Sequence, residues 1–174
     1  MTTYSCEKQD LFPFFLLDKE NGFFLDVACA HPINASNTYL LEQQKNWTGV
    51  CVDIGDVESL YSWSKIRKAK SFQADATSDE FVEILKKSVG SRLVDYLSLD
   101  VDVGGYVEKN LTHLALRRVL EAGIRFRCAT IEHESFKYGE SARNEMRDSL
   151  LSRDRKSTRL NSSHIPLSRM PSSA

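Results

Sequence analysis

Acidic side chains stand at or near the ends of several short apolar runs in this sequence. Such runs, separated by helical patterns, predict parallel strands, and the carboxyl ends of parallel strands meet in one crevice of an open α/β sheet. Carboxylates gathered there could bind a ribose diol, neutralise a cation or accept a proton. Each is costly to desolvate without a partner, so several together favour a binding function. The candidates are Asp26, Asp53, Asp75, Asp100 and Glu132.

Residues 22–53 carry the most informative pattern. An apolar run at 23–27 ends in a turn of small residues, a helical pattern follows, and a second apolar run closes on Asp53. This is a β-α-β unit of about thirty residues. In such units a nucleotide-like ligand lies across the carboxyl ends of the strands, and the acid that ends the second strand binds the ribose diol. The pattern predicts that role for Asp53.

Strands and helices are predicted to alternate along the chain. The predicted strands are 23–27, 49–53, 71–74, 94–99 and 126–131, and the predicted helices are 36–45, 57–67, 77–89, 109–122 and a last one from 140. This alternation indicates an α/β fold, a Rossmann-like three-layer α-β-α sandwich with a mostly parallel sheet and right-handed crossovers. We assign 1–21 to a lead-in segment and 22–153 to the domain.

Local signals mark several helix ends. Ser36 is a plausible N-cap of the first helix of the domain, and Thr77 with Glu80 forms a T-x-x-E capping box. Asp75 precedes that helix, so a capping role is an alternative to ligand binding for it. Pro13 is expected to break the lead-in helix. The basic run at 65–70 is typical of a solvated surface.

The segment 154–174 differs from the rest of the chain. Its pieces DRKSTRLNSSH and SRMPSSA back-translate to sequences that resemble a sequencing-library adapter, in the right order and frame. We predict that this tail is not native, that the domain is incomplete and that its C-terminal strands are missing. The alternative is a natural Ser/Arg-rich disordered tail.

Composition narrows the class of protein. The hydrophobic fraction of 41% supports a globular core, and the net charge of −1 argues against a nucleic-acid binder. The apolar cluster at 12–17 is too short to span a bilayer, so we expect no membrane association. Four scattered cysteines without a C-x-x-C pair favour a reducing compartment and a cytoplasmic location. They are Cys6, Cys29, Cys51 and Cys128. The sequence leaves the oligomeric state open.

Five segments, in this order and spacing, resemble the class I S-adenosylmethionine-dependent methyltransferases, and within them the FkbM-type family. They are FFLDVACAHPINASNTYLLE, WTGVCVDI, FQADATS, VDYLSLDVD and TIEHE. The resemblance implies S-adenosylmethionine as cofactor and O-methylation of a sugar or another small hydroxylated metabolite. It also implies two further strands at one edge of the sheet.

The resemblance assigns cofactor-binding roles to six residues. Asp26, Ala28 and Ala30 fall on the family's D-x-G-x-N/G run, with alanine in place of both glycines. Alanine resists positive φ, so this turn departs from the family pattern. Asp53 matches the acid that binds the ribose. The remaining two, Asp75 and Ala76, match the pair beside the adenine.

Three further residues are candidates for catalysis. The resemblance places Asp100 and Asp102 at the acidic end of the fourth strand, next to the transferred methyl group. Methyl transfer is an in-line displacement that depends on alignment, and a hydroxyl acceptor also benefits from a base. His133 is the first candidate for that base, with a structural role as its alternative. Asp100 and Asp102 are alternatives as base or Mg²⁺ ligands, although two carboxylates alone define no metal site and we predict none.

Two other functions stay open at this point. One is an NAD-type oxidoreductase domain, although the first turn lacks G-x-G-x-x-G and no helix begins directly after it. The other is a non-catalytic nucleotide-binding fragment. Titration with a methyl donor and with NAD would separate these readings from methyl transfer.

Overall fold

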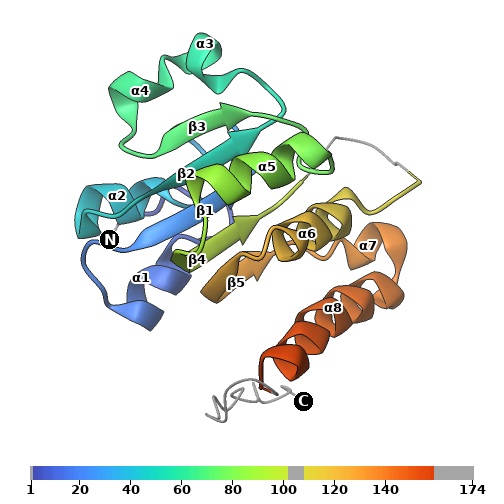
Figure 1. The fold of residues 1–174 in the computed structure, drawn as a ribbon. Helices are drawn as coiled ribbons and strands as arrows, with labels where there is room; N and C mark the ends of the chain where they lie inside the picture. Colours follow the sequence, from blue (N-terminus) through green and yellow to red (C-terminus); the bar gives the residue numbers. More distant parts are fainter. Residues whose placement is uncertain (1, 102–107, 159–174) are drawn as a thin grey trace.

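The computed structural model describes residues 2–101 and 108–158, and it has a five-stranded sheet in which every neighbouring pair is parallel (Figure 1). The strand order is β3-β2-β1-β4-β5. The chain therefore builds outward from β1 to β3, then crosses back to place β4 on the other side of β1. This order puts a topological switch point between β1 and β4. The strands are β1 (Phe23–Val27), β2 (Thr48–Asp53), β3 (Lys70–Gln73), β4 (Leu93–Leu99) and β5 (Arg125–Ile131).

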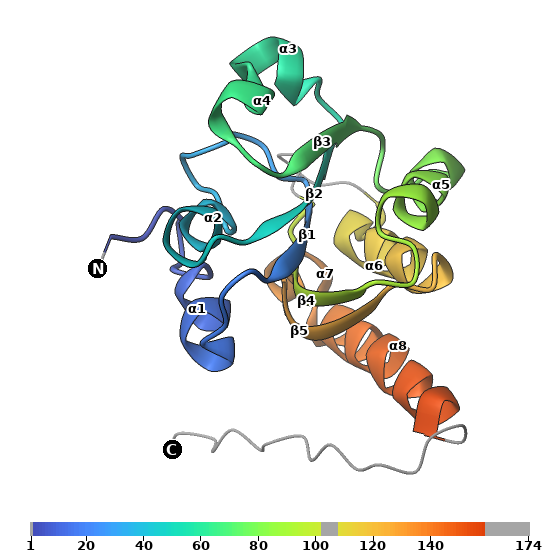
Figure 2. The same ribbon diagram turned by 60° about the vertical axis from the view of Figure 1, so that its left-hand side comes forward.

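Helices cover both faces of this sheet (Figure 2). One face carries α1 (Leu11–Leu17), α2 (Tyr39–Lys45), α3 (Val57–Tyr61) and α4 (Trp63–Ile66). The other carries α5 (Asp79–Ser88), α6 (Leu111–Glu121) and α8 (Glu140–Thr158), and α7 (Ser135–Tyr138) joins β5 to α8. The fold is α/β and Rossmann-like, as the alternation of apolar runs and helical patterns predicted.

Strand β1 lies at the centre of the sheet and is buried on both faces. All five of its residues are buried. Phe23, Leu25 and Val27 pack in the apolar core beneath α5 and α6, whereas Phe24 packs in the second core beneath α2 and α4. Because side chains alternate along a strand, Asp26 points to the same face as Phe24. This strand therefore carries a carboxylate into the protein interior, directly below the sheet's carboxyl edge.

Several predicted helix boundaries are corrected by the structure. Helix α1 runs through Pro13, because proline is tolerated in the first turn, where backbone N–H groups have no intrahelical partner. The N-cap of α5 is Ser78 rather than Thr77, since the Ser78 hydroxyl accepts from the backbone N–H of Phe81. The single helix expected at 57–67 is divided into α3 and α4 at Ser62, whose φ is 53°.

The C-terminal helix α8 begins at Glu140, where the sequence predicted a helix. It continues to Thr158 and so passes the expected domain boundary at 153. The rest of the predicted tail, 159–174, lies outside the described residues. In the described part of the chain, no helix has the length and apolar character needed to cross a membrane.

Candidate functional site

A cavity of about 460 Å³ opens at the carboxyl edge of the sheet, beside the switch point between β1 and β4. Its volume lies within the range of small-molecule sites. It is lined by the ends of β1 and β2, by the loops that follow β1, β2, β3 and β4, and by Cys6, Gln9 and Leu111. All six residues predicted to contact a cofactor line this cavity, and Asp100 lines it as well. The six are Asp26, Ala28, Ala30, Asp53, Asp75 and Ala76.

The turn after β1 adopts an unusual backbone conformation. Ala28 and Ala30 have φ values of 61° and 48°, and Ala35 follows with 58°. Alanine in the left-handed region costs about 1–2 kcal/mol, so this turn is strained at three positions. Hydrogen bonds hold it against β2, with the Ala28 N–H donating to the carbonyl of Val52 at 2.8 Å. The structure thus retains the turn that glycine favours, although alanine occupies it.

Asp53 ends β2 and lies at the edge of the cavity. Its Oδ2 accepts from the backbone N–H of Ala30 at 2.9 Å, and its Oδ1 accepts from Gly55 at 2.8 Å. These bonds fix the carboxylate between two loops. Because each carboxylate oxygen has two acceptor sites, each keeps one site for a further donor. A pair of adjacent hydroxyls, as in a ribose diol, would satisfy both.

Asp26 lies beneath the cavity, with only 3% of its surface exposed. Its Oδ2 accepts from the Thr38 hydroxyl at 2.7 Å. Burial raises the pKa of Asp26, against the opposing effects of the Thr38 hydrogen bond and the positive charge of Arg67. The nearby Asp100 carboxylate raises the same pKa further. A positive charge placed in the cavity would stabilise the charged forms of both carboxylates.

Asp100 follows β4 and places one carboxylate oxygen, Oδ1, in the interior. Its Oδ1 is buried and has no hydrogen-bond partner among the described residues. A buried acceptor without a partner costs stability, so its presence in a native protein calls for an explanation. The orphaned oxygen lines the same cavity as Asp26 and Asp53.

Asp75 follows β3 and shapes the loop before α5. Its Oδ1 accepts from both the backbone N–H and the hydroxyl of Thr77, each at 2.8 Å. Because Ser78 caps α5, Asp75 is not the N-cap of that helix. Its carboxylate and Ala76 therefore stand at the cavity edge as part of a turn.

The structure does not bring His133 into the cavity. This residue is exposed, and its Nδ1 accepts from the backbone N–H of Ser135 at 3.1 Å. The hydrogen bond occupies the lone pair that a base would use at Nδ1, so His133 as a base stays a prediction that requires the bond to open. Asp102 lies outside the described residues, and its role also stays a prediction.

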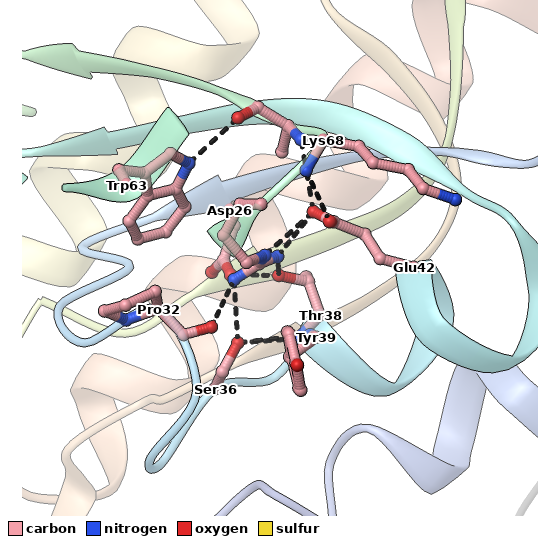
Figure 3. Close-up of polar contacts among 10 residues, drawn as sticks. Asp26, Pro32, Ser36, Thr38, Tyr39, Glu42, Trp63 and Lys68 are labelled. Atoms are coloured by element: carbon pink, nitrogen blue, oxygen red, sulfur yellow. Dashed lines mark hydrogen bonds and ion pairs between the residues drawn. The ribbon is translucent and has the colours of Figure 1, made fainter. Parts of the chain in front are cut away.

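A buried polar network behind the cavity was missed by the sequence analysis (Figure 3). The basic run at 65–70 was expected on the surface, yet the Arg67 side chain is fully buried and pairs with Glu42 at 2.9 Å. Asn37 lines the cavity and donates to the Ser98 hydroxyl at 3.0 Å. In the sequence, Glu42 follows the apolar pair Leu40 and Leu41, which hints at a buried carboxylate in need of a partner but does not identify Arg67 as that partner.

Comparisons with known proteins place these features in context. Neither models of known protein families nor curated protein sequences give a match to this chain. Among solved structures, the chain is similar to a TehB-like SAM-dependent methyltransferase from Corynebacterium glutamicum, at 13% identity and a TM-score of 0.45, over 66% of this chain and 55% of that one.

Two further solved structures share this distant similarity. One is CurA from Vibrio vulnificus, at 12% identity and a TM-score of 0.40, over 83% of this chain and 50% of that one. The other is a candidate NADPH:quinone reductase from Bacillus thuringiensis, at 14% identity and a TM-score of 0.41, with the same coverage of 83% and 50%. The chain spans about half the length of these proteins. At this distance none of their activities carries over to it.

Fold and cavity together define the class: a Rossmann-like α/β domain with an acidic cavity at its topological switch point.

Proposed function

We propose that this chain is the cofactor-binding domain of an S-adenosylmethionine-dependent methyltransferase. The proposal extends to O-methylation of a sugar or another small hydroxylated metabolite, which the sequence resemblance implies. The observation that carries it is the placement of Asp53. Two backbone N–H groups hold its carboxylate at the cavity edge, and its remaining acceptor sites suit a ribose diol.

The charges around the cavity support a sulfonium ligand over a neutral or anionic one. Asp26 and Asp100 lie on the β1 and β4 side of the cavity, and one buried oxygen of Asp100 has no partner among the residues that the structure describes. A cation placed between them would offset the desolvation of both carboxylates. A dinucleotide instead brings a pyrophosphate to the first turn, where these carboxylates would repel it.

Each wall of the cavity then has a distinct task. Asp53 would hold the ribose, and Asp75 with Ala76 would border the adenine. Bound S-adenosylmethionine supplies an electrophilic methyl group. The protein's contribution is to align the acceptor oxygen with that group, with Asp100, Asp102 or His133 as candidates to receive the acceptor's proton.

Calorimetric titration of the full chain with S-adenosylmethionine and, separately, with NAD tests this proposal. We expect binding of the methyl donor and none of NAD. Asp53→Ala should weaken donor binding by roughly 100-fold, since two hydrogen bonds to a charged group are lost at about 1.5 kcal/mol each. Glu80→Ala is the matched control, because it removes an exposed carboxylate that lies outside the cavity.

Three results would count against the proposal. NAD binding in place of donor binding would favour the oxidoreductase alternative. Absence of both would favour a non-catalytic fragment. Equal donor affinity in the wild type and Asp53→Ala would show that the ribose is not held at β2.

A further inference from the structure

The guanidinium of Arg67 is the centre of the buried network behind the cavity. Its Nε donates to Glu42 Oε1 at 2.9 Å. Its Nη1 donates to the carbonyl of Pro32 at 2.9 Å and to the Ser36 hydroxyl at 3.2 Å. Its Nη2 donates to the Thr38 hydroxyl at 2.8 Å. We call Arg67 with these four partners the Arg67 clamp.

The opposite side of the clamp is anchored in the α4–β3 connection. Glu42 Oε2 accepts from the backbone N–H of Lys68 at 2.8 Å, and Trp63 Nε1 donates to the carbonyl of Ala69 at 2.8 Å (Figure 3). The guanidinium carbon also lies 4.8 Å from the centre of the Trp63 ring. A buried cation is therefore held by a carboxylate and an aromatic face on the side away from the cavity.

The cavity side of the clamp is the loop that follows β1. Pro32, Ser36 and Thr38 all belong to it, and the same Thr38 hydroxyl that accepts from Arg67 donates to Asp26. One hydroxyl thus connects the buried guanidinium to a carboxylate that lines the cavity. Arg67 itself is absent from the cavity lining.

The loop that the clamp holds is the strained one. Ala28, Ala30 and Ala35 all have left-handed φ values within eight residues. Conformations of this kind persist only where surrounding contacts over-determine them. Three donors from one rigid, planar group provide such contacts, whereas a lysine ammonium could not reach all four partners at once.

From this geometry we infer that Arg67 is a positioning residue for the ligand cavity: it holds the loop at 28–38 and, through Thr38, the Asp26 carboxylate in the arrangement that binds ligand. The inference rests on the proposed function for the identity of that ligand. It assigns a role in binding to a residue that touches no ligand.

The first test measures affinity for S-adenosylhomocysteine by calorimetry. Arg67→Met combined with Glu42→Gln removes both buried charges and leaves an acceptor for the Lys68 N–H, so a cooperative melt should persist. We expect its affinity to fall roughly 2- to 30-fold, as for residues that act through others. Arg67→Lys should fall between this variant and the wild type.

Two matched comparisons separate positioning from general packing. Thr38→Ser keeps the connecting hydroxyl and should bind like the wild type, whereas the equally sized Thr38→Val should bind several-fold more weakly. Arg127→Met removes a cation from the buried Asp95 carboxylate, far from the cavity, and should leave affinity unchanged. Affinity within twofold of wild type in the folded double variant would overturn the inference.

Amide hydrogen exchange provides a readout that needs no ligand. In the double variant, the amides of Ala30 and Tyr39, bonded to Asp53 and Ser36, should exchange faster, while those of Val50–Val52 in β2 stay as protected as in the wild type. If the wild type binds no adenosyl ligand, the proposed function fails. The exchange measurement then tests by itself whether Arg67 holds the loop at 28–38. Unchanged exchange at 28–39 would overturn the inference in either case.

Discussion

The two ends of β4 carry carboxylates in opposite situations. Asp95, near the amino end, is buried and accepts from Lys19 Nζ on both oxygens, from the Phe23 N–H at 2.9 Å and from Arg127 Nε at 3.0 Å. Asp100, just beyond the carboxyl end, has a buried oxygen with no partner in the described part of the chain. Within the described residues, the carboxylate at one end of the strand is fully paired, and the one at the other end keeps an oxygen without a partner.

This difference suggests that the carboxylate at one end of β4 serves stability, while the one at the other end, among the described residues, is free for a different task. Asp95 joins the lead-in segment, β1, β4 and β5, so it fastens four parts of the chain at the sheet's amino edge. At the carboxyl edge the described residues instead include a strained turn and a buried acceptor without a partner among them. Such costs persist where they serve a site, and native proteins offset them elsewhere in the fold.

The largest expected effect is the loss of stability on Asp95→Asn. The substitution removes the charge that pairs with Lys19 and Arg127 and weakens every bond to that group. Breaking a buried charge pair typically costs 3–5 kcal/mol, and the exposed parts of both cations reduce this to about 2–3 kcal/mol here. Urea unfolding of the variant and the wild type measures the difference. If the free energy of unfolding falls by less than about 0.5 kcal/mol, as for an ordinary surface substitution, the Asp95 contacts do not stabilise the amino edge of the sheet.

Asp100→Asn should affect ligand affinity more than stability. Its buried oxygen has no partner to lose among the described residues, and removal of a charge near Asp26 should leave stability unchanged or raise it by about 1 kcal/mol. Ligand affinity should fall roughly tenfold, because a cation loses one of its two nearby carboxylates. Unfolding and calorimetry on the same variant test both parts. A destabilisation as large as that of Asp95→Asn would remove the contrast between the two ends.

The pH dependence of stability sharpens the comparison, because folding lowers the pKa of Asp95 and raises the pKa of Asp26. Burial alone would raise the pKa of Asp95, but the hydrogen bonds from Lys19 and Phe23 and the charges of Lys19 and Arg127 lower it below its ordinary value. Its contribution is therefore present above the unfolded pKa of about 3.9 and is lost as pH falls through the lowered folded value. Burial raises the pKa of Asp26, so stability falls as pH rises from about 3.9 through that raised value.

Urea unfolding across an acid pH series checks these signs. Asp95→Asn should flatten the acid limb below about pH 4, and Asp26→Asn should remove the decline above it. The asparagine at position 26 can still accept from the Thr38 hydroxyl, so the loop remains in place. If the free energy of unfolding depends on pH in the same way in the wild type and both variants, the opposite pKa shifts assigned to Asp95 and Asp26 are wrong.

The sequence predicted the fold well, because β1, β2 and β4 are short, mostly apolar runs flanked by turn signals. It also predicted that Asp26, Asp53, Asp75 and Asp100 gather at the carboxyl edge, since parallel strands bring their ends together whatever lies between them, whereas Glu132 does not line the cavity. The Arg67 clamp could not be predicted in this way. A basic run reads as a solvated surface, and only the fold shows that position 67 turns inward to meet Glu42 from a helix 25 residues earlier.

Asp95 escaped sequence analysis for a related reason. Its partners, Lys19 and Arg127, lie 76 and 32 residues away along the chain. No local pattern connects them, because strand order rather than spacing brings β5 beside β4. His133 illustrates the reverse case. Its position after a strand suggested a place in the cavity, but the hydrogen bond to Ser135 holds the ring in the turn before α7.

The smallest expected effect concerns the strain in the turn after β1. Ala30→Gly relieves a left-handed alanine, worth about 1–2 kcal/mol, but adds unfolded-state entropy of about 0.4–1 kcal/mol. The net expectation is a gain of about 0.5 kcal/mol, the difference between these two terms. Ala76→Gly is the matched control, since Ala76 lines the same cavity without a positive φ and should lose stability instead. A gain in stability for Ala30→Gly together with a loss for Ala76→Gly would locate backbone strain at the carboxyl edge of the sheet. Equal losses of stability for both substitutions would mean that Ala30 is not strained.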